Sequence, residues 1–149
     1  MASSSFVYVT YIRTTPEKLW DALTKPGFTR QYWFGITMDC AWEKGAPWKM
    51  VFEDGRVADA GEILEIEKPR RIVIKWRNEF MPELKAEGYS RCVIALEPVN
   101  ESVKLTITHT IDKEGSKFIQ AVSGGWPQIL ASLKSLLETG EALPRPVRK

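Results

Sequence analysis

The chain has 149 residues, a length typical of one domain with its own hydrophobic core. Its 21 basic and 19 acidic residues give a net charge of +2 and are mixed along the chain, so charge gives no reason to expect a nucleic-acid or membrane-surface partner. No stretch is apolar for long enough to span a bilayer, and the N-terminus lacks the basic and apolar regions of a secretory signal. We therefore expect a cytoplasmic protein.

The cysteines agree with that expectation, and the C-terminal residues indicate where the domain ends. Cys40 and Cys92 are far apart and lack CxxC spacing, so we interpret them as buried free thiols in a reducing compartment rather than as a disulfide or metal ligands. The basic cluster at residues 144–149 (PRPVRK) is interpreted as a solvated, disordered tail. Residues 1–143 are thus predicted to form one domain.

The N-terminal part is predicted to contain a strand followed by two short helices. Phe6–Ile12 is a run of β-branched and aromatic residues, which is typical of a strand. Thr15 and the proline after it match a helix N-cap followed by proline at the first helical position, so we predict a helix over Pro16–Thr24. The aromatic segment Phe28–Phe34 is predicted to form a second short helix.

The middle of the chain is predicted to consist of strands joined by turns. Trp48, Met50 and Phe52 alternate with residues of the opposite face, which is the period of a half-buried strand. Asp54-Gly55 is a strong hairpin signal. The predicted strands are Trp48–Glu53, Arg56–Glu67 with Gly61 as a possible bulge, Ile72–Trp76, Tyr89–Leu96 and Val103–Ile111, with a loop at residues 78–88.

The clearest periodicity lies at the C-terminal end. From Val103 to Ile111 every second residue is apolar or is His109, so one face should be buried and the other wet, as in an antiparallel sheet. From Ser116 to about Glu138 the period is helical, and about twenty-three residues at a 1.5 Å rise would span roughly 35 Å. Pro127 inside this helix should kink it near Gly124-Gly125. We predict a long amphipathic helix that packs across the sheet.

Four segments carry a resemblance to a known family. They are Ile12–Gly27 (IRTTPEKLWDALTKPG), Gly61–Trp76 (GEILEIEKPRRIVIKW), Leu105–His109 (LTITH) and Gly125–Gly140, which contains GWPQIL and LKSLLETG. In this order they resemble the START-like (SRPBCC) superfamily and, within it, the Aha-type branch named after the C-terminal domain of the heat-shock ATPase activator. The resemblance extends from about Phe6 to Leu143.

The resemblance implies an α+β helix-grip fold. In this fold a curved antiparallel sheet of six to seven strands wraps around a long C-terminal helix, with two short helices after the first strand. A cavity is expected between the sheet and the helix, and such cavities in the superfamily usually hold small apolar or amphipathic molecules.

Signals of catalysis are few. A single histidine excludes a multi-histidine metal site, and no glycine-rich phosphate loop or nucleophile elbow is present, so we expect neither a metal nor a cofactor. His109 is the one candidate acid or base because it lies on the apolar face of the last strand. We favour its interpretation as a core histidine that a hydroxyl or backbone group satisfies. Asp59, Glu62 and Glu65 are its candidate carboxylate partners, and we interpret all three as part of a solvated sheet face.

Large apolar side chains are placed to line the inside of the expected grip. The candidate ligand-binding residues are Trp33, Trp48, Met50, Phe52, Trp76, Tyr89, His109, Phe118, Val122 and Trp126. Phe34 and Trp42 lie with Trp33 in the rim segments, and Arg77, Arg91 and Tyr89 are candidate polar contacts near the mouth. A solid aromatic core without a cavity is the alternative.

Three functions stay open at this point. The leading hypothesis is a non-catalytic carrier or sensor that binds a small hydrophobic or amphipathic molecule. The second, from the resemblance, is an Aha-type interaction module with a chaperone or other protein partner. The third is a cyclase- or aromatase-like enzyme that uses His109 and Tyr89 as acid–base groups.

Overall fold

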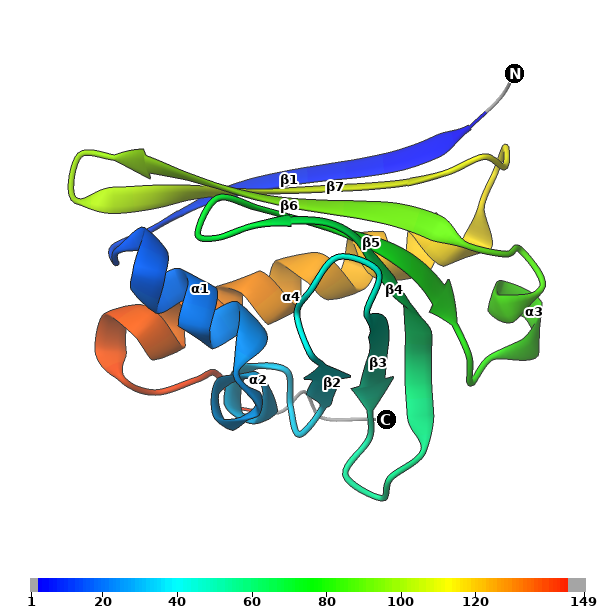
Figure 1. Ribbon diagram of the computed structural model, residues 1–149, viewed down its shortest axis with the longest axis horizontal. Coiled ribbons are helices and arrows are strands. Elements are labelled where there is room, and N and C mark those ends of the chain that lie inside the picture. Colours follow the sequence, from blue (N-terminus) through cyan, green and yellow to red (C-terminus); the bar gives the residue numbers. More distant parts are fainter. Residues whose placement is uncertain (1–2, 145–149) are drawn as a thin grey trace.

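Seven antiparallel strands form one curved sheet in the computed structural model, which describes residues 3–144 (Figure 1). The order across the sheet is β1-β7-β6-β5-β4-β3-β2, and every neighbouring pair is antiparallel. The strands are β1 (Ser4–Ile12), β2 (Thr37–Cys40), β3 (Pro47–Val51), β4 (Val57–Glu67), β5 (Arg71–Asn78), β6 (Ser90–Val99) and β7 (Ser102–Ile111). The helices are α1 (Pro16–Thr24), α2 (Pro26–Tyr32), α3 (Pro82–Lys85) and α4 (Lys117–Thr139).

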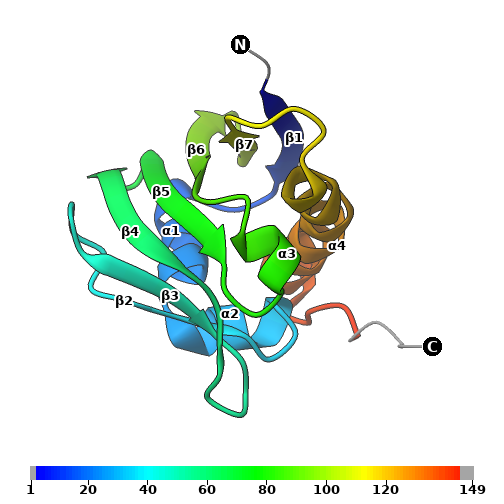
Figure 2. The same ribbon diagram turned by 90° about the vertical axis from the view of Figure 1, so that its right-hand side faces the viewer.

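The sheet curves around the long helix. In Figure 2 the strands turn from β1, which lies beside α4, to β2 and β3 on the other side of the molecule. α4 packs against β1 and contacts β7 and α2, while α1 and α2 lie after the first strand. This arrangement is the helix-grip fold, as predicted.

The ends of the two main helices follow from their capping residues. The Thr15 hydroxyl accepts a hydrogen bond from the Lys18 N–H at 3.2 Å, and α1 has the predicted bounds. At α4 the Ser116 hydroxyl accepts from the Ile119 N–H at 3.0 Å. Gly140 follows α4 with φ 87°, a left-handed conformation that glycine adopts at low cost, and its N–H donates to the Leu136 carbonyl.

Several boundaries differ from the prediction. β2 was not predicted, because four residues are too few for a periodic signal. The predicted loop at 78–88 contains the single turn α3. β6 and β7 extend to a turn at Asn100-Glu101, so the hairpin between them is tighter than the sequence indicated.

Gly61 is not a bulge. The irregularity of β4 against β5 falls between Ile63 and Glu65, and Gly61 pairs in register with Trp76. A Cβ atom at position 61 would lie 1.6 Å from the Lys75 carbonyl oxygen. The residue is glycine because two backbones approach closely there.

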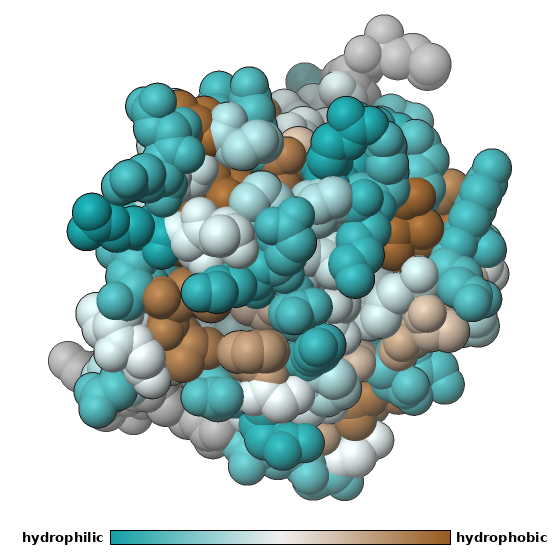
Figure 3. Space-filling model, turned by 60° about the vertical axis from the view of Figure 1, so that its left-hand side comes forward, coloured by the Kyte–Doolittle hydropathy of each residue, from teal (hydrophilic) through white to brown (hydrophobic). Residues whose placement is uncertain are grey.

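The core lies between the concave face of the sheet and the helices. β7 alternates strictly between buried and half-buried positions, with Val103, Leu105, Ile107, His109 and Ile111 buried, as predicted. The face drawn in Figure 3 is mostly hydrophilic, and its hydrophobic residues form small separate groups, which is ordinary for a protein surface.

Both cysteines are free thiols, Cys92 buried and Cys40 half-buried, as predicted. Burial raises the pKa of each thiol. None of the described helices is both long and apolar enough to cross a bilayer. The predicted basic tail, apart from Pro144, lies outside the described residues.

Candidate ligand-binding cavity

A cavity of about 350 Å³ lies between the sheet and α4. α4 contributes Phe118, Ala121, Val122, Gly125, Trp126, Gln128 and Ile129 to its wall. The strands and the segments after α2 and β5 contribute Met50, Phe52, Ala58, Asp59, Trp76, Asn78, Trp33, Phe34, Ile36, Phe80 and Leu84. Phe80 lines the cavity and is also 47% exposed, so the cavity opens to solvent beside the segment between β5 and α3.

Three tryptophans form one end of the wall. The Trp33 ring meets the Trp126 ring edge-on at 5.3 Å between centroids, and Trp76 lies 5.7 Å from Trp126 and 6.4 Å from Trp33. The indole N–H groups of two of them have partners in the protein: Trp76 donates to Asp59 at 2.6 Å and Trp126 donates to His109 Nδ1 at 3.2 Å. Because these donors are satisfied, the two indoles offer the cavity mainly apolar ring surface.

His109 lies behind this wall and is fully buried. Its Nδ1 accepts from the Trp126 indole, which places the imidazole proton on Nε2, where it donates to the Ser90 hydroxyl at 2.9 Å. The Ser90 hydroxyl donates in turn to the Trp76 carbonyl. Burial lowers the pKa of His109 from 6.5 to about 3. The residue is therefore a neutral histidine with both nitrogens engaged, and it is absent from the cavity wall.

Asp59 is the functional candidate that sequence reasoning placed wrongly. It was assigned to a solvated sheet face, but it is only 8% exposed and lines the cavity. Burial raises the pKa of its carboxyl group from 3.8 to about 6, which outweighs the lowering by the Trp76 hydrogen bond, and the negative charge of Glu79 raises it further. The sequence contains a signal for this position. Side chains two residues apart on a strand point to the same face, so Asp59 and Gly61 share the inner face with the buried Ile63.

The other candidate carboxylates do lie on the outer face. Glu62 pairs with Lys75 at 3.9 Å, and Glu65 pairs with Arg71 at 3.8 Å and with Arg91 at 3.3 Å. All of these side chains are substantially exposed. Arg91 is thus a surface residue and not a polar contact of the cavity mouth.

Tyr89 also faces outward and is exposed. Its ring is covered by Lys75 and Arg77, whose charged groups lie 4.5 and 4.6 Å from the ring centroid. Arg77 also makes a bidentate ion pair with Glu79. Lys85 Nζ lies 3.4 Å from the same carboxylate. The structure therefore does not bring Tyr89, Arg77 or Arg91 to the cavity.

The remaining predicted residues divide between wall and core. Trp33, Met50, Phe52, Trp76, Phe118, Val122 and Trp126 line the cavity, as does the rim residue Phe34. Trp48 is fully buried against Trp76, at 4.4 Å between ring centroids, and Trp42 packs on the core. The cavity is also lined by Ile36, Asn78, Phe80 and Leu84, which the sequence does not predict as wall residues. Ile36 lies just before the short strand β2, and the other three lie within residues 78–88, for which the sequence predicts a loop.

No group of metal-binding side chains occurs within residues 3–144. The wall described above is instead mostly apolar, with Asp59, Asn78 and Gln128 as its polar side chains. Such a composition suits the retention of a small molecule that is itself mostly apolar.

The family model for Activator of Hsp90 ATPase homolog 1-like protein matches residues 13–138. The chain belongs to this family. The match confirms the Aha-type branch of the START-like superfamily that the four sequence segments indicated. A comparison with curated proteins found no match.

Solved structures share the fold at low sequence identity. CalU16 from Micromonospora echinospora superposes with a TM-score of 0.74 at 20% identity, covering 93% of this chain and 78% of that one. The protein MLL2253 from Mesorhizobium loti gives a TM-score of 0.77 at 23% identity, with coverage of 91% and 97%. The Hsp90 activator PFC0360w from Plasmodium falciparum gives 0.72 at 24% identity, with coverage of 89% and 95%. At these identities the likeness establishes the fold alone.

Proposed function

We propose that this protein binds a small hydrophobic or amphipathic molecule in the cavity between the sheet and α4, as a carrier or sensor. The observation that supports the proposal is the cavity itself, about 350 Å³ in volume, open to solvent and lined mainly by apolar side chains. Small-molecule pockets typically have volumes of roughly 300–1,000 Å³ and few polar groups. Two other hollows of similar volume, about 320 and 360 Å³, are lined mainly by charged and polar side chains, so the apolar wall is what distinguishes this cavity.

The acid–base pair of the enzymatic hypothesis does not meet in this cavity. His109 is buried with both nitrogens hydrogen-bonded, and its pKa of about 3 keeps it neutral near neutral pH. Tyr89 lies on the opposite face of the sheet under two cationic side chains. The geometry therefore favours binding over catalysis by these two groups.

Two measurements on the purified protein test the binding proposal. Native mass spectrometry of freshly purified chain should reveal a co-purifying small molecule, or an empty protein that takes up the neutral dye N-phenyl-1-naphthylamine. Dye fluorescence should rise on mixing and should fall when an alkyl compound competes. If no molecule co-purifies and the dye neither brightens nor shifts the melting temperature, the proposal is wrong.

A second candidate function is protein interaction of the Aha type. Besides the family match, one specific observation favours it: the edge strand β1 exposes Val7, Val9 and Tyr11 on its outer face, each at least 43% accessible. Exposed apolar residues on an edge strand are a common protein-docking surface. An ATPase assay with a purified Hsp90-type chaperone tests it. The chain should accelerate hydrolysis and Val9→Lys should weaken the effect, whereas an unchanged ATPase rate would remove this candidate.

A further inference from the structure

Asp59 places an uncompensated negative charge in an apolar cavity. Among the described residues that line the cavity it is the only one with an ionisable side chain. Its carboxyl group receives one hydrogen bond, from the Trp76 indole, and no lysine or arginine in the described part of the chain pairs with it. Burying a carboxylate without a cationic partner is costly, so proteins seldom keep one without a use.

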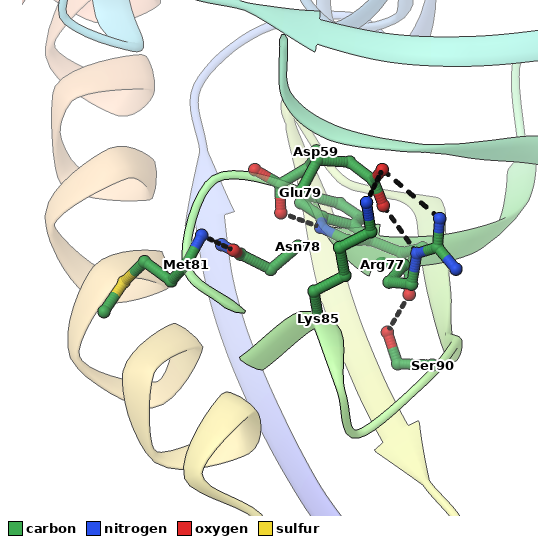
Figure 4. A network of polar contacts seen from close by, with 8 residues as sticks. Asp59, Arg77, Asn78, Glu79, Met81, Lys85 and Ser90 are labelled. Atoms are coloured by element: carbon green, nitrogen blue, oxygen red, sulfur yellow. Dashed lines mark hydrogen bonds and ion pairs between the residues drawn. The ribbon is translucent and has the colours of Figure 1, made fainter. Parts of the chain in front are cut away.

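The neighbouring cations are held by another carboxylate. Figure 4 shows the carboxyl groups of Asp59 and Glu79 turned to opposite sides: Asp59 points to the side where α4 lies, and Glu79 points to Arg77 and Lys85. Hydrogen bonding to Arg77 lowers the pKa of Glu79, so this group stays ionised near neutral pH. Arg77 and Lys85 are therefore engaged away from Asp59, and α4 offers no charged side chain to the cavity.

Aromatic rings surround the same space. Trp33, Trp76 and Trp126 lie within 6.4 Å of one another between ring centroids, and Phe34, Phe52 and Phe118 also line the cavity. The faces of aromatic rings carry partial negative charge and attract cations, tryptophan most strongly. A buried carboxylate among tryptophans is thus complementary to a positive charge on an apolar body.

We infer that the cavity selects cationic hydrophobic ligands, with an amine or quaternary ammonium group beside Asp59 and the apolar part among the aromatic rings. The inference rests on the proposed binding function and names the class of ligand for that site. A preference for cations is opposite to what the overall charge of the protein would produce, because a net charge of +2 by itself slightly favours an anionic ligand. A preference for cations must therefore arise locally.

Competition among three probes with the same alkyl chain tests the inference. Decyltrimethylammonium and decyl sulfate, each below its critical micelle concentration, and decanol, below its solubility limit, are to be compared as competitors of bound N-phenyl-1-naphthylamine at about pH 7.5. We expect the ammonium compound to compete about tenfold more strongly than decanol and the sulfate to compete least. Equal competition by the three compounds, or a preference for the sulfate, would overturn the inference while dye binding would still support a hydrophobic cavity. Failure of the dye itself to bind would instead overturn the proposed function.

Two variants on β4 separate the local charge from the overall charge. Asp59→Asn removes the cavity carboxylate but keeps an acceptor for the Trp76 indole, and it should bring competition by the ammonium compound down to the level of decanol. Glu62→Gln removes one charge three residues along the same strand, on the outer face, and should preserve the preference. A preference that survives in Asp59→Asn, or that is lost in Glu62→Gln, contradicts the assignment to Asp59.

The pH provides a measurement that does not depend on a variant. Glu79 is the charged group that acts on Asp59 through space, and hydrogen bonding to Arg77 lowers its pKa, so the group at the cavity whose charge changes near pH 6 is Asp59. The cation preference should therefore shrink as the pH falls from about 7.5 to 5, where Asp59 becomes protonated. A preference that stays constant over this range would mean that another group is responsible.

Discussion

Gly125 allows the cavity to be filled without disturbing the fold. It lies in α4, lines the cavity, and has open space around the position of a Cβ atom, with nothing within 4 Å. Gly124 precedes it in the same helix, also has open space, and is absent from the cavity wall. Gly125→Leu and Gly124→Leu therefore form a matched pair that differs in whether the isobutyl group stands at the cavity.

Both substitutions should stabilise the helix by a similar amount. Glycine in a helix interior is about 0.8–1.0 kcal/mol less favourable than alanine, and leucine is close to alanine. For a chain of this length about 1 kcal/mol corresponds to a rise of about 2–4 °C in melting temperature. We expect this rise in both variants, measured by circular dichroism or differential scanning fluorimetry without ligand.

Ligand binding should separate the two variants. In titrations with N-phenyl-1-naphthylamine, Gly125→Leu should weaken binding by about tenfold or more, since each tenfold step corresponds to about 1.4 kcal/mol of lost contact or steric conflict. Gly124→Leu should bind the dye like the parent protein. Equal binding by both variants would show that the dye site is not this cavity. A melting temperature that falls in Gly125→Leu alone would show that the space beside Gly125 is not free.

Three further variants probe stability. Glu87 accepts from the Ser116 hydroxyl at 2.6 Å and from the Lys117 and Phe118 N–H groups at the start of α4; burial would raise its pKa, but these bonds outweigh that and lower it. Glu87→Gln should therefore lower the free energy of unfolding by about 1 kcal/mol, measured by urea denaturation at about pH 7. The difference between variant and parent should vanish as the pH falls through the lowered pKa of Glu87, and a difference that stays constant would refute this. Gly61→Ala should lower the unfolding free energy by about 3 kcal/mol or more, or prevent folding, because its Cβ would meet the Lys75 carbonyl; a parent-like melting temperature would contradict the close approach. For Asp59 the dependence of stability on pH is opposite to that of Glu87, because burial raises the pKa of Asp59 from 3.8 to about 6. The folded protein therefore loses stability, relative to its value below pH 3.8, as the pH rises and Asp59 ionises. Asp59→Asn should thus gain about 3 kcal/mol at about pH 8, from roughly two pKa units at 1.36 kcal/mol each, and should equal the parent below about pH 4; no gain at high pH would mean that ionising Asp59 costs nothing.

Local pattern was sufficient for most of the secondary structure. The apolar stripe of α4 predicted the bounds of the helix within one residue at each end. The alternation along β7 predicted its buried face, because neighbouring side chains of a strand must point to opposite sides. These features depend on residues a few positions apart, so the sequence displays them directly.

The same alternation, applied more strictly, would have corrected two assignments. It puts Asp59 on the face of Ile63, inside the grip, and it puts Tyr89 on the face opposite the buried Ser90 and Cys92. Glu65 shares the parity of Asp59 but is exposed, because the irregularity between Ile63 and Glu65 turns the end of β4 over. A one-residue irregularity of this kind exchanges the two faces of a strand and has no clear signature in the sequence.

The sequence by itself determined the helix-grip fold, its main elements and the aromatic character of the space between sheet and α4. Only the tertiary structure decided which of those aromatics leave a cavity and which fill the core. Trp48 packs on Trp76 and is fully buried, His109 is enclosed by Trp126 and Ser90, and Phe80, in the segment between β5 and α3, lies at the mouth. The physical reason is that periodicity fixes the direction of each side chain, whereas a cavity depends on how far the curved sheet stands from the helix and on which rings meet across that gap.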